Sequence, residues 1–337
     1  MFIVIEGTDA SGKSSLIYSI EKVLQERYPE AHITKFHKGR PDEETRRWVL
    51  NDYVNSIEKR NWFRSVALSD RWHWGEVTYA PKYRAHTNED GYGLLGKAGW
   101  RWTELFLMSR GVAQFWLYQP LDVIQRRLEF RGDDFVNVDD LKDILVNYHT
   151  AATKSCIIER LDPPEDSFDL IPQIAEYVVN TAAHVEEMAQ KLELFPNYIG
   201  NPNPQILLVG DKRNITKRHG EETQLPFMPV DGNSAEYLLS SLPEHVWRNV
   251  GLININDQDN KESFTALWTM LGFPSIVVLG RLAEKTLSSI PIHDDYYTVL
   301  PHPQYVRRFF NTQKEEYGLA IERAANKGDK ENPWIMR

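Results

Sequence analysis

The sequence of 337 residues has almost no cysteine and no long hydrophobic run. Its one cysteine, Cys156, cannot form a disulfide within the chain, and this fits a reducing compartment. No segment is long and apolar enough to predict a membrane-spanning helix, and the first apolar residues lack the basic flank of a signal peptide. We therefore expect a cytoplasmic protein without a membrane partner, in a cell or in an infected bacterial host.

A positive charge excess is also absent. The chain carries a formal net charge of −9, which argues against a general nucleic-acid coat protein. Most of the acidic excess lies before residue 200, so residues 200–337 are nearly neutral and leave room for a local basic face. The length of the chain favours two domains.

The most informative stretch lies at the start of the chain. Phe2–Ile5 predict a buried strand, residues 7–14 match G-x-x-x-x-G-K-[ST], and apolar residues recur at helical spacing from Leu16. In this context the motif forms a P-loop, whose backbone N–H groups and helix N-terminus bind phosphate. Lys13 is expected to reach the β- and γ-phosphates of ATP, and Ser14 to bind Mg²⁺. The predicted nucleotide-binding residues are Gly7, Asp9, Gly12, Lys13, Ser14 and Ser15.

Later apolar segments extend this motif into an α/β domain. His32–His37, Ser65–Ser69 and Gln114–Tyr118 are predicted strands, and the second of them ends in Asp70-Arg71. Ligands of such sheets bind beyond the carboxyl ends of the strands, so Asp70 is a candidate Mg²⁺ ligand or base. We predict a P-loop fold with a parallel sheet and helices on both faces.

Over about residues 1–180 these motifs resemble the thymidylate kinase family of nucleoside monophosphate kinases. Residues 2–14 reproduce the family's opening signature F-I-x-x-E-G-x-D-x-x-G-K-S/T, and Asp70-Arg71 matches its Asp-Arg pair. Arg127 and Arg131, followed by Asp134, match its lid. The resemblance implies that ATP with Mg²⁺ is the phosphoryl donor and a thymidylate-like deoxynucleotide the acceptor.

The resemblance also implies roles for single residues. Asp9 would contact the acceptor, Asp70 would place Mg²⁺ or the attacking oxygen, and Arg71 would hold the acceptor phosphate. Arg127 and Arg131 would stabilise charge on the transferred phosphoryl group, although a solvated helix face is the alternative for them. The expected catalytic residues are Lys13, Asp70, Arg71, Arg127 and Arg131, with Ser14 and Asp70 as metal ligands and Tyr148 as the family's helix tyrosine.

The acceptor side departs from the family pattern. Where the family has Arg-Glu-Pro-Gly, Lys38 and Arg40 are the candidate phosphate ligands. Residues 72–102 are rich in aromatic residues and glycine and are predicted to form a flexible loop, in which each tryptophan either stacks on a base or lies in the core. The expected substrate-binding residues are Asp9, Lys38, Arg40, Arg71, Trp74 and Tyr79.

A segment rich in proline and asparagine, residues 196–203, predicts a linker between domain 1–195 and domain 204–337. Four apolar segments after it predict a second three-layer α/β domain. The motifs in order are Leu208-Val209-Gly210-Asp211, Pro226-Phe227 with Gly232-Asn233-Ser234, an asparagine after the second segment, Val277-Val278-Leu279-Gly280 with Ala283, and His302-Pro303 followed by Arg307. This order resembles the uracil-DNA glycosylase superfamily, and the resemblance implies a pocket formed by Asp211, Phe227, Asn254 and His302.

Excision of uracil is not expected. The loop Asp211-Lys212-Arg213-Asn214 lacks the small residues that let a backbone approach a flipped base. Three functions stay open: a thymidylate-like deoxynucleotide kinase, a kinase for a modified pyrimidine such as 5-hydroxymethyluracil in phage DNA, and a DNA-binding protein with a regulatory P-loop. The expected partners are a deoxynucleotide or a DNA base, with DNA contacting residues 204–337, and a homodimer is left open.

Overall fold

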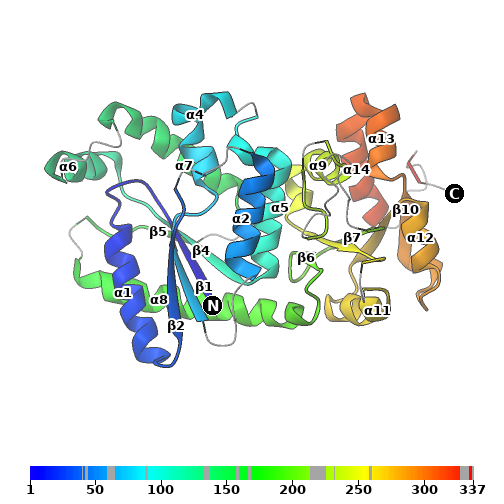
Figure 1. The fold of residues 1–337 in the computed structure, drawn as a ribbon, viewed down its shortest axis with the longest axis horizontal. Helices are drawn as coiled ribbons and strands as arrows, with labels where there is room; N and C mark the ends of the chain where they lie inside the picture. The colour runs from blue at the N-terminus through cyan, green and yellow to red at the C-terminus, as the bar shows by residue number, and fades with distance from the viewer. Residues whose placement is uncertain are drawn as a thin grey trace. The chain divides into compact units, whose positions relative to one another are not determined.

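The chain forms two compact units (Figure 1). In the computed structural model unit 1 comprises Met1–Gly96 and Gly111–Gln190, and unit 2 comprises Lys97–Arg110 and Lys191–Arg337. Both units are α/β structures, which confirms the predicted fold class. The structure describes residues 1–39, 41, 45–58, 65–87, 90–131, 137–156, 159–165, 168–212, 225–230, 232–257, 260–326 and 334–335.

Unit 1 is organised around a five-stranded parallel sheet with the order β2-β3-β1-β4-β5. All five residues of the central strand are buried, as expected for a strand covered on both faces. The register places His37 of β2 beside Asp70 of β3, so the polar ends of these strands meet at one edge. The strands are β1 (Phe2–Glu6), β2 (His32–His37), β3 (Ser65–Asp70), β4 (Val112–Leu117) and β5 (Glu159–Leu161).

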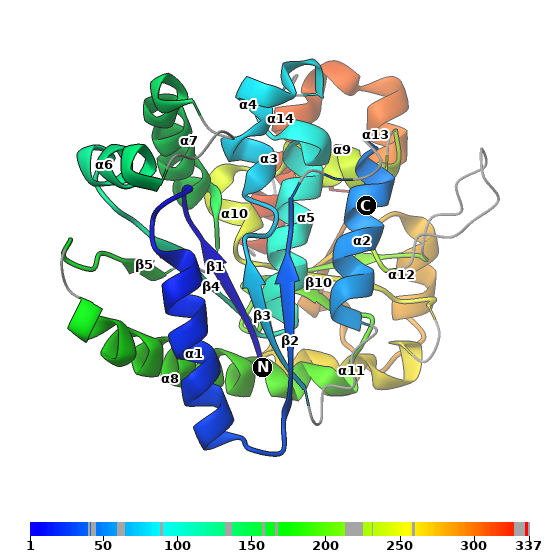
Figure 2. The same cartoon turned by 60° about the vertical axis from the view of Figure 1, so that its left-hand side comes forward.

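Helices cover both faces of this sheet. On one face α1 and α8 pack side by side, and their apolar residues Leu16 and Val178 share a buried cluster with Ile3 (Figures 1 and 2). On the other face Tyr148 of α7 packs against Trp116 of β4. The α-helices of unit 1 are α1 (Lys13–Arg27), α2 (Arg46–Glu58), α3 (Gly75–Thr78), α4 (Ala80–Tyr83), α6 (Leu121–Arg131), α7 (Leu141–Lys154) and α8 (Ile171–Gln190).

The described part of residues 72–102 is not the flexible loop that we expected. It forms α3, α4, 3-10 turns at Ala85–Thr87 and Gly93–Leu95, and the first half of α5 (Gly96–Ser109). Burial of aromatic rings explains the order, because Trp72 and Trp74 are almost completely buried. Tyr53 of α2 stacks on the ring of Trp72.

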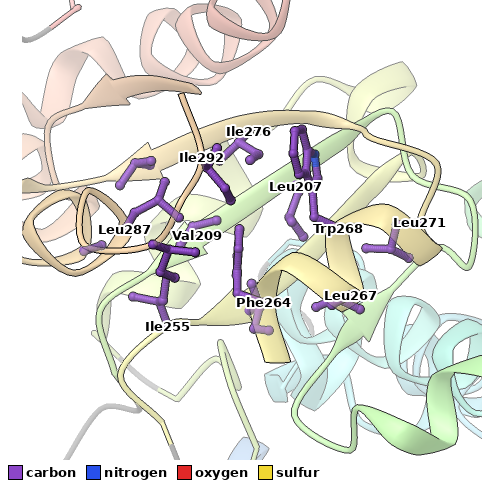
Figure 3. Close-up of a cluster of buried hydrophobic side chains, with 14 of the residues drawn as sticks. Leu207, Val209, Ile255, Phe264, Leu267, Trp268, Leu271, Ile276, Leu287 and Ile292 are labelled. Carbon is purple, nitrogen blue, oxygen red and sulfur yellow. The ribbon is translucent and has the colours of Figure 1, made fainter. Parts of the chain in front are cut away.

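Unit 2 has its own sheet with the order β10-β9-β7-β8-β6, in which only β6 runs antiparallel to its neighbour. Helix α11 places Phe264 and Leu267 against Leu207 and Val209 of β7, and Leu287 of α12 joins the same core (Figure 3). The strands are β6 (Ile199–Gly200), β7 (Ile206–Gly210), β8 (Val250–Asn254), β9 (Ser275–Leu279) and β10 (Tyr297–Leu300). The α-helices after α5 are α9 (Ser234–Ser241), α10 (Glu244–Trp247), α11 (Asn260–Met270), α12 (Arg281–Leu287), α13 (Pro303–Phe309) and α14 (Lys314–Ala325).

The expected linker, residues 196–203, belongs to unit 2. Strand β6 lies within it and pairs with β8, and the side chain of Tyr198 is fully buried. Among the helices that the structure describes, none combines the length and the apolar composition that crossing a membrane requires.

Unit 2 also contains α5, which lies before β4 in the sequence. Arg101 of α5 is buried and donates hydrogen bonds to the carbonyl oxygens of Leu239 (2.7 Å) and Leu242 (2.6 Å). Its guanidinium group also pairs with Glu244 at 2.7 Å. These carbonyls end helix α9, where a cation satisfies groups that lack an intrahelical partner. The chain therefore enters unit 2 twice, first at Lys97–Arg110 and again at Lys191. A single division of the chain at residues 196–203 leaves out the first of these segments.

Glu6, the last residue of β1, fixes the backbone that follows Asp70-Arg71. Its Oε1 atom accepts hydrogen bonds from the backbone N–H groups of Trp72 (2.8 Å) and Trp74 (3.4 Å). The Oε2 atom is buried without a hydrogen-bond partner among the described residues. Burial raises the pKa of Glu6 to about 7, although the nearby His73 opposes this shift.

The raised pKa predicts how Glu6 affects stability. The folded chain holds this proton up to about pH 7 and the unfolded chain releases it near 4.5, so the free energy of unfolding falls as pH rises between these values. The loss should total about 3 kcal/mol. In Glu6→Gln this loss is absent, so the variant should gain stability relative to the parent from pH 5 to pH 8. Urea unfolding followed by tryptophan fluorescence measures the difference, and parallel pH profiles would contradict the assignment.

Candidate functional site

The P-loop has the conformation that the motif predicts. Gly12 precedes helix α1 with φ +97°, in the left-handed region that favours glycine. A Cβ atom on Gly7 would lie 2.7 Å from the carbonyl oxygen of Leu117, so this position has no room for a side chain. The loop is thereby held against the end of β4 with its helix N-terminus open to an anion.

Lys13 lies buried at the start of α1. Its Nζ atom donates a hydrogen bond to the carbonyl oxygen of Thr8 at 2.6 Å and lies 4.0 Å from Oδ1 of Asp70. Burial lowers the pKa of Lys13 to about 8, and the positive charge of Arg71 acts in the same direction. An anionic ligand would oppose both effects, so the site favours phosphate.

Arg71 connects the P-loop to the segment after β3. Its Nη2 atom donates to Asp9 at 2.5 Å and to the hydroxyl of Tyr79 at 3.1 Å, and its Nε atom donates to the carbonyl oxygen of Gly7 at 3.3 Å. The hydroxyl of Tyr148 donates to the same carbonyl at 2.7 Å. Arg71 lowers the pKa of Asp9 against the effect of burial, so this carboxylate is ionised at neutral pH.

Arg127 of helix α6 reaches the P-loop. Its Nη1 atom donates to the carbonyl oxygens of Ala10 (3.3 Å) and Ser11 (3.4 Å), and its Nη2 atom donates to that of Glu165 (3.0 Å). This places a guanidinium group directly beside the loop that would hold phosphates. A cation in that position can stabilise charge on a transferring phosphoryl group.

These elements enclose one cavity of about 500 Å³, a size suited to a nucleotide. It brings together all five predicted catalytic residues and most of the predicted nucleotide-binding ones: Asp9, Gly12, Lys13, Ser14, Ser15, Asp70, Arg71, Arg127 and Arg131. It also contains three features that our sequence interpretation missed: His37, Gln119 and Pro163–Glu165. Ligands of parallel sheets bind beyond the carboxyl ends of the strands, and this rule predicted Asp70. The same rule could have predicted His37, since both residues end parallel strands.

Other predicted substrate residues lie outside the cavity lining. Lys38 turns to helix α2, where its Nζ atom donates to Asp52 (2.5 Å) and Ser56 (2.9 Å). Trp74 is fully buried. Tyr79 does not line the cavity, but its hydroxyl contacts two residues that do, since it accepts a hydrogen bond from Arg71 and donates one to Asp9, both at 3.1 Å. Two further predicted positions, Arg40 and Asp134, lie outside the described residues.

Oxygen atoms suited to Mg²⁺ occur in the same cavity. Oδ1 of Asp70 is buried without a hydrogen-bond partner among the described residues, and the exposed hydroxyl of Ser14 lines the same space. A carboxylate and a hydroxyl fit a hard cation that keeps several waters and binds phosphates. Ser14 and Asp70 would hold the ion.

The predicted residues of the second domain also converge. Asp211, Phe227, Asn254 and His302 line a cavity of about 30 Å³ in unit 2. This space admits only about two water molecules, so a planar ligand would have to lie at its mouth, against the half-buried Phe227. The remaining lining residues are Gly210, Lys212, Met228, Asn233, Ser234, Ala235, Leu279 and Pro303.

The backbone of this second cavity is strained. Phe227 has φ +52°, which is uncommon for a residue with a side chain and costs of order 1–3 kcal/mol. A Cβ atom on Gly210 would lie 2.7 Å from the Phe227 ring and 2.5 Å from Oδ1 of Asn254, so only glycine allows this close packing. His302 begins helix α13, where its Nδ1 atom accepts a hydrogen bond from the Gln304 N–H at 3.2 Å. Strain of this kind is often found at ligand sites.

Comparison with known proteins finds similarity in structure only. No protein-family model and no curated protein matches the sequence. The crystal structure of YorR protein from Bacillus subtilis, in complex with phosphorylated GDP, is 21% identical over 55% of this chain and 98% of its own, with a TM-score of 0.42. Deoxyadenosine kinase from M. mycoides with bound dCTP is 13% identical over 54% of this chain and 100% of its own, with a TM-score of 0.33.

Proposed function

We propose that unit 1 is a cytoplasmic kinase that transfers the γ-phosphoryl group of ATP to a deoxynucleotide-type acceptor. The observation that carries this proposal is the convergence of Lys13, Asp70 and Arg127 on one nucleotide-sized cavity at the P-loop. Phosphoryl transfer needs positioning and positive charge more than covalent chemistry. This cavity supplies both.

Each side chain has a defined task in this reaction. Lys13 and the backbone of the P-loop bind the β- and γ-phosphates, and Arg127 stabilises charge on the transferring group. Ser14 and Asp70 would hold Mg²⁺, which would supply charge neutralisation for the phosphates. Arg71 and Asp9 face the acceptor. The resemblance to thymidylate kinases points to a thymidylate-like acceptor, and a modified pyrimidine in DNA is the alternative.

The kinase proposal predicts the behaviour of Lys13→Ala. Phosphoryl transfer should fall by about 100-fold or more, because one preorganised cation on the transferring group is lost. The thermal unfolding temperature should change little, because the variant removes a buried charge that is only weakly paired. Among the described residues, the one carboxylate close to Lys13 is that of Asp70, at 4.0 Å. Transfer of label from γ-labelled ATP measures the loss.

Lys22→Ala provides the matched control for this variant. Lys22 lies on the same helix, and its Nζ atom contacts only the Tyr18 ring in the described interactions. Its transfer rate should equal that of the parent. Turnover of Lys13→Ala near the parent rate would refute the kinase assignment.

For unit 2 we propose recognition of a nucleobase, free or in DNA, without uracil excision. The supporting observation is that Phe227, Asn254 and His302 surround one cavity beside Asp211. An aromatic ring can stack on a base, and amide and imidazole groups can bond its polar edge. Lys212 is exposed at the same cavity and can contact a phosphate.

This second proposal predicts a specific effect of Phe227→Ala. Stacking on an aromatic side chain contributes about 1–3 kcal/mol per base, so affinity should fall about tenfold or more. The measurement is fluorescence anisotropy with a uracil-containing single-stranded oligonucleotide at low salt, using full-length protein that also carries Lys13→Ala.

Phe273→Ala is the matched control for the loss of stacking. Phe273 is also a phenylalanine of unit 2 with positive φ, it is 60% exposed, and it does not line the cavity. Its substitution should leave the affinity unchanged. Equal losses in both variants, or abasic sites formed at catalytic rates, would refute the proposal.

A further inference from the structure

The two ends of the unit 1 cavity differ in chemistry. The P-loop follows the central strand β1, with β4 and β5 on one side and β3 and β2 on the other. Toward β5 the lining is largely apolar, with Leu117, Pro163 and Ile174, and this suits the base of a donor nucleotide. In-line transfer places the acceptor on the far side of the γ-phosphate from the leaving ADP. The acceptor therefore belongs at the ends of β2 and β3.

The described cations expected to bind an acceptor phosphate are already paired with carboxylates. Lys38 donates to Asp52 and Ser56, and its side chain is only 16% exposed. Arg71 pairs with Asp9 at 2.5 Å, so its charge is balanced within the protein. A phosphate monoester carries up to two negative charges and needs cations that are not neutralised.

Where the structure describes this end, it also offers hydrogen-bond acceptors. His37 ends β2 with its side chain 63% exposed, and its Nδ1 atom lies 3.7 Å from Oδ2 of Asp70. In the described lining of this end, the carboxylates of Asp9 and Asp70 lie beside two cations, the guanidinium group of Arg71 and the ammonium group of Lys13. Lys13 is taken up by the donor phosphates in the proposed reaction. An acceptor phosphate would therefore meet no cation of the described residues at this end that a carboxylate does not already balance. A neutral hydroxyl group needs no such cation and would donate a hydrogen bond to the exposed imidazole of His37.

We infer that the acceptor is a primary hydroxyl group of a deoxynucleoside, free or within a DNA strand, and not the phosphate of a thymidylate-like mononucleotide, which the resemblance to thymidylate kinases implies. This inference rests on the proposed kinase function. The hydroxyl oxygen forms a bond to the γ-phosphorus, the bond from that phosphorus to the β–γ bridging oxygen breaks, ADP leaves, and the hydroxyl proton passes to water. The product is a phosphate monoester. No new phosphoanhydride is formed.

The test compares acceptors that differ in the phosphate and hydroxyl groups they offer. The full-length protein is incubated with γ-labelled ATP, Mg²⁺ and, in separate arms, deoxynucleosides, their 5′-monophosphates, and 5′-monophosphorylated oligonucleotides with or without a hydroxymethylpyrimidine; a fourth arm uses 5′-hydroxyl oligonucleotides. Mass spectrometry and alkaline phosphatase distinguish a monoester from a diphosphate. We expect a labelled monoester in a nucleoside or hydroxyl-bearing DNA arm, and the labelled arm identifies the source.

The outcomes separate the two proposals. Label on mononucleotides as nucleoside diphosphates would overturn the hydroxyl inference and leave the kinase function standing. ATP that is neither consumed nor transferred in any arm would overturn both.

A pair of variants on β2 adds an independent measurement. His37→Phe should lower kcat/KM for the acceptor about tenfold, the effect of one hydrogen bond, without changing the KM for ATP. His37→Gln, which keeps an acceptor atom, should recover part of this loss. His32→Phe, at the exposed start of the same strand, is the control. Equal losses in His32→Phe and His37→Phe, or a change confined to the KM for ATP, would overturn the role of His37.

Discussion

The carbonyl group of Gly7 holds the functional parts of unit 1 together. It accepts hydrogen bonds from the hydroxyl of Tyr148 on α7 and from Nε of Arg71 after β3. Arg71 has φ +65°, a conformation that costs energy for a residue with a side chain and persists where its surroundings fix it. Since Gly7 also begins the P-loop, the phosphate-binding backbone and the Asp9–Arg71 pair occupy one fixed geometry.

Local motifs were predictable from the sequence, and long-range contacts were not. Gly12 and Lys13 act through backbone conformation and a helix terminus, which depend on residues a few positions away. The side chain of Lys38 depends instead on Asp52, fourteen positions away on helix α2. No spacing rule relates these two residues, because the direction of a side chain is set by packing between elements. Trp74 was similarly ambiguous, since aromatic residues form both base-binding surfaces and cores.

The limits of unit 2 show the same distinction. Strands β7 to β10 and the convergence of Asp211, Phe227, Asn254 and His302 followed from the order of motifs along the chain, whereas β6 lies in the predicted linker. The motifs did not predict that α5 belongs to unit 2, because α5 precedes a strand of unit 1 in the sequence. It is recognised only through partners such as Leu239, 138 positions from Arg101. A buried arginine inside a glycine- and tryptophan-rich helix gives no indication of such a distant partner.

The split origin of unit 2 has a consequence during protein synthesis. Chains grow at about 5–20 residues per second, so α5 leaves the ribosome on the order of ten seconds before the carbonyl groups that Arg101 binds. Throughout this interval the buried face of α5, with Trp100, Trp102 and Phe106, has no completed core to join. Unit 1 is therefore synthesised with a helix of unit 2 inserted before its strand β4, while the rest of unit 2 is still missing.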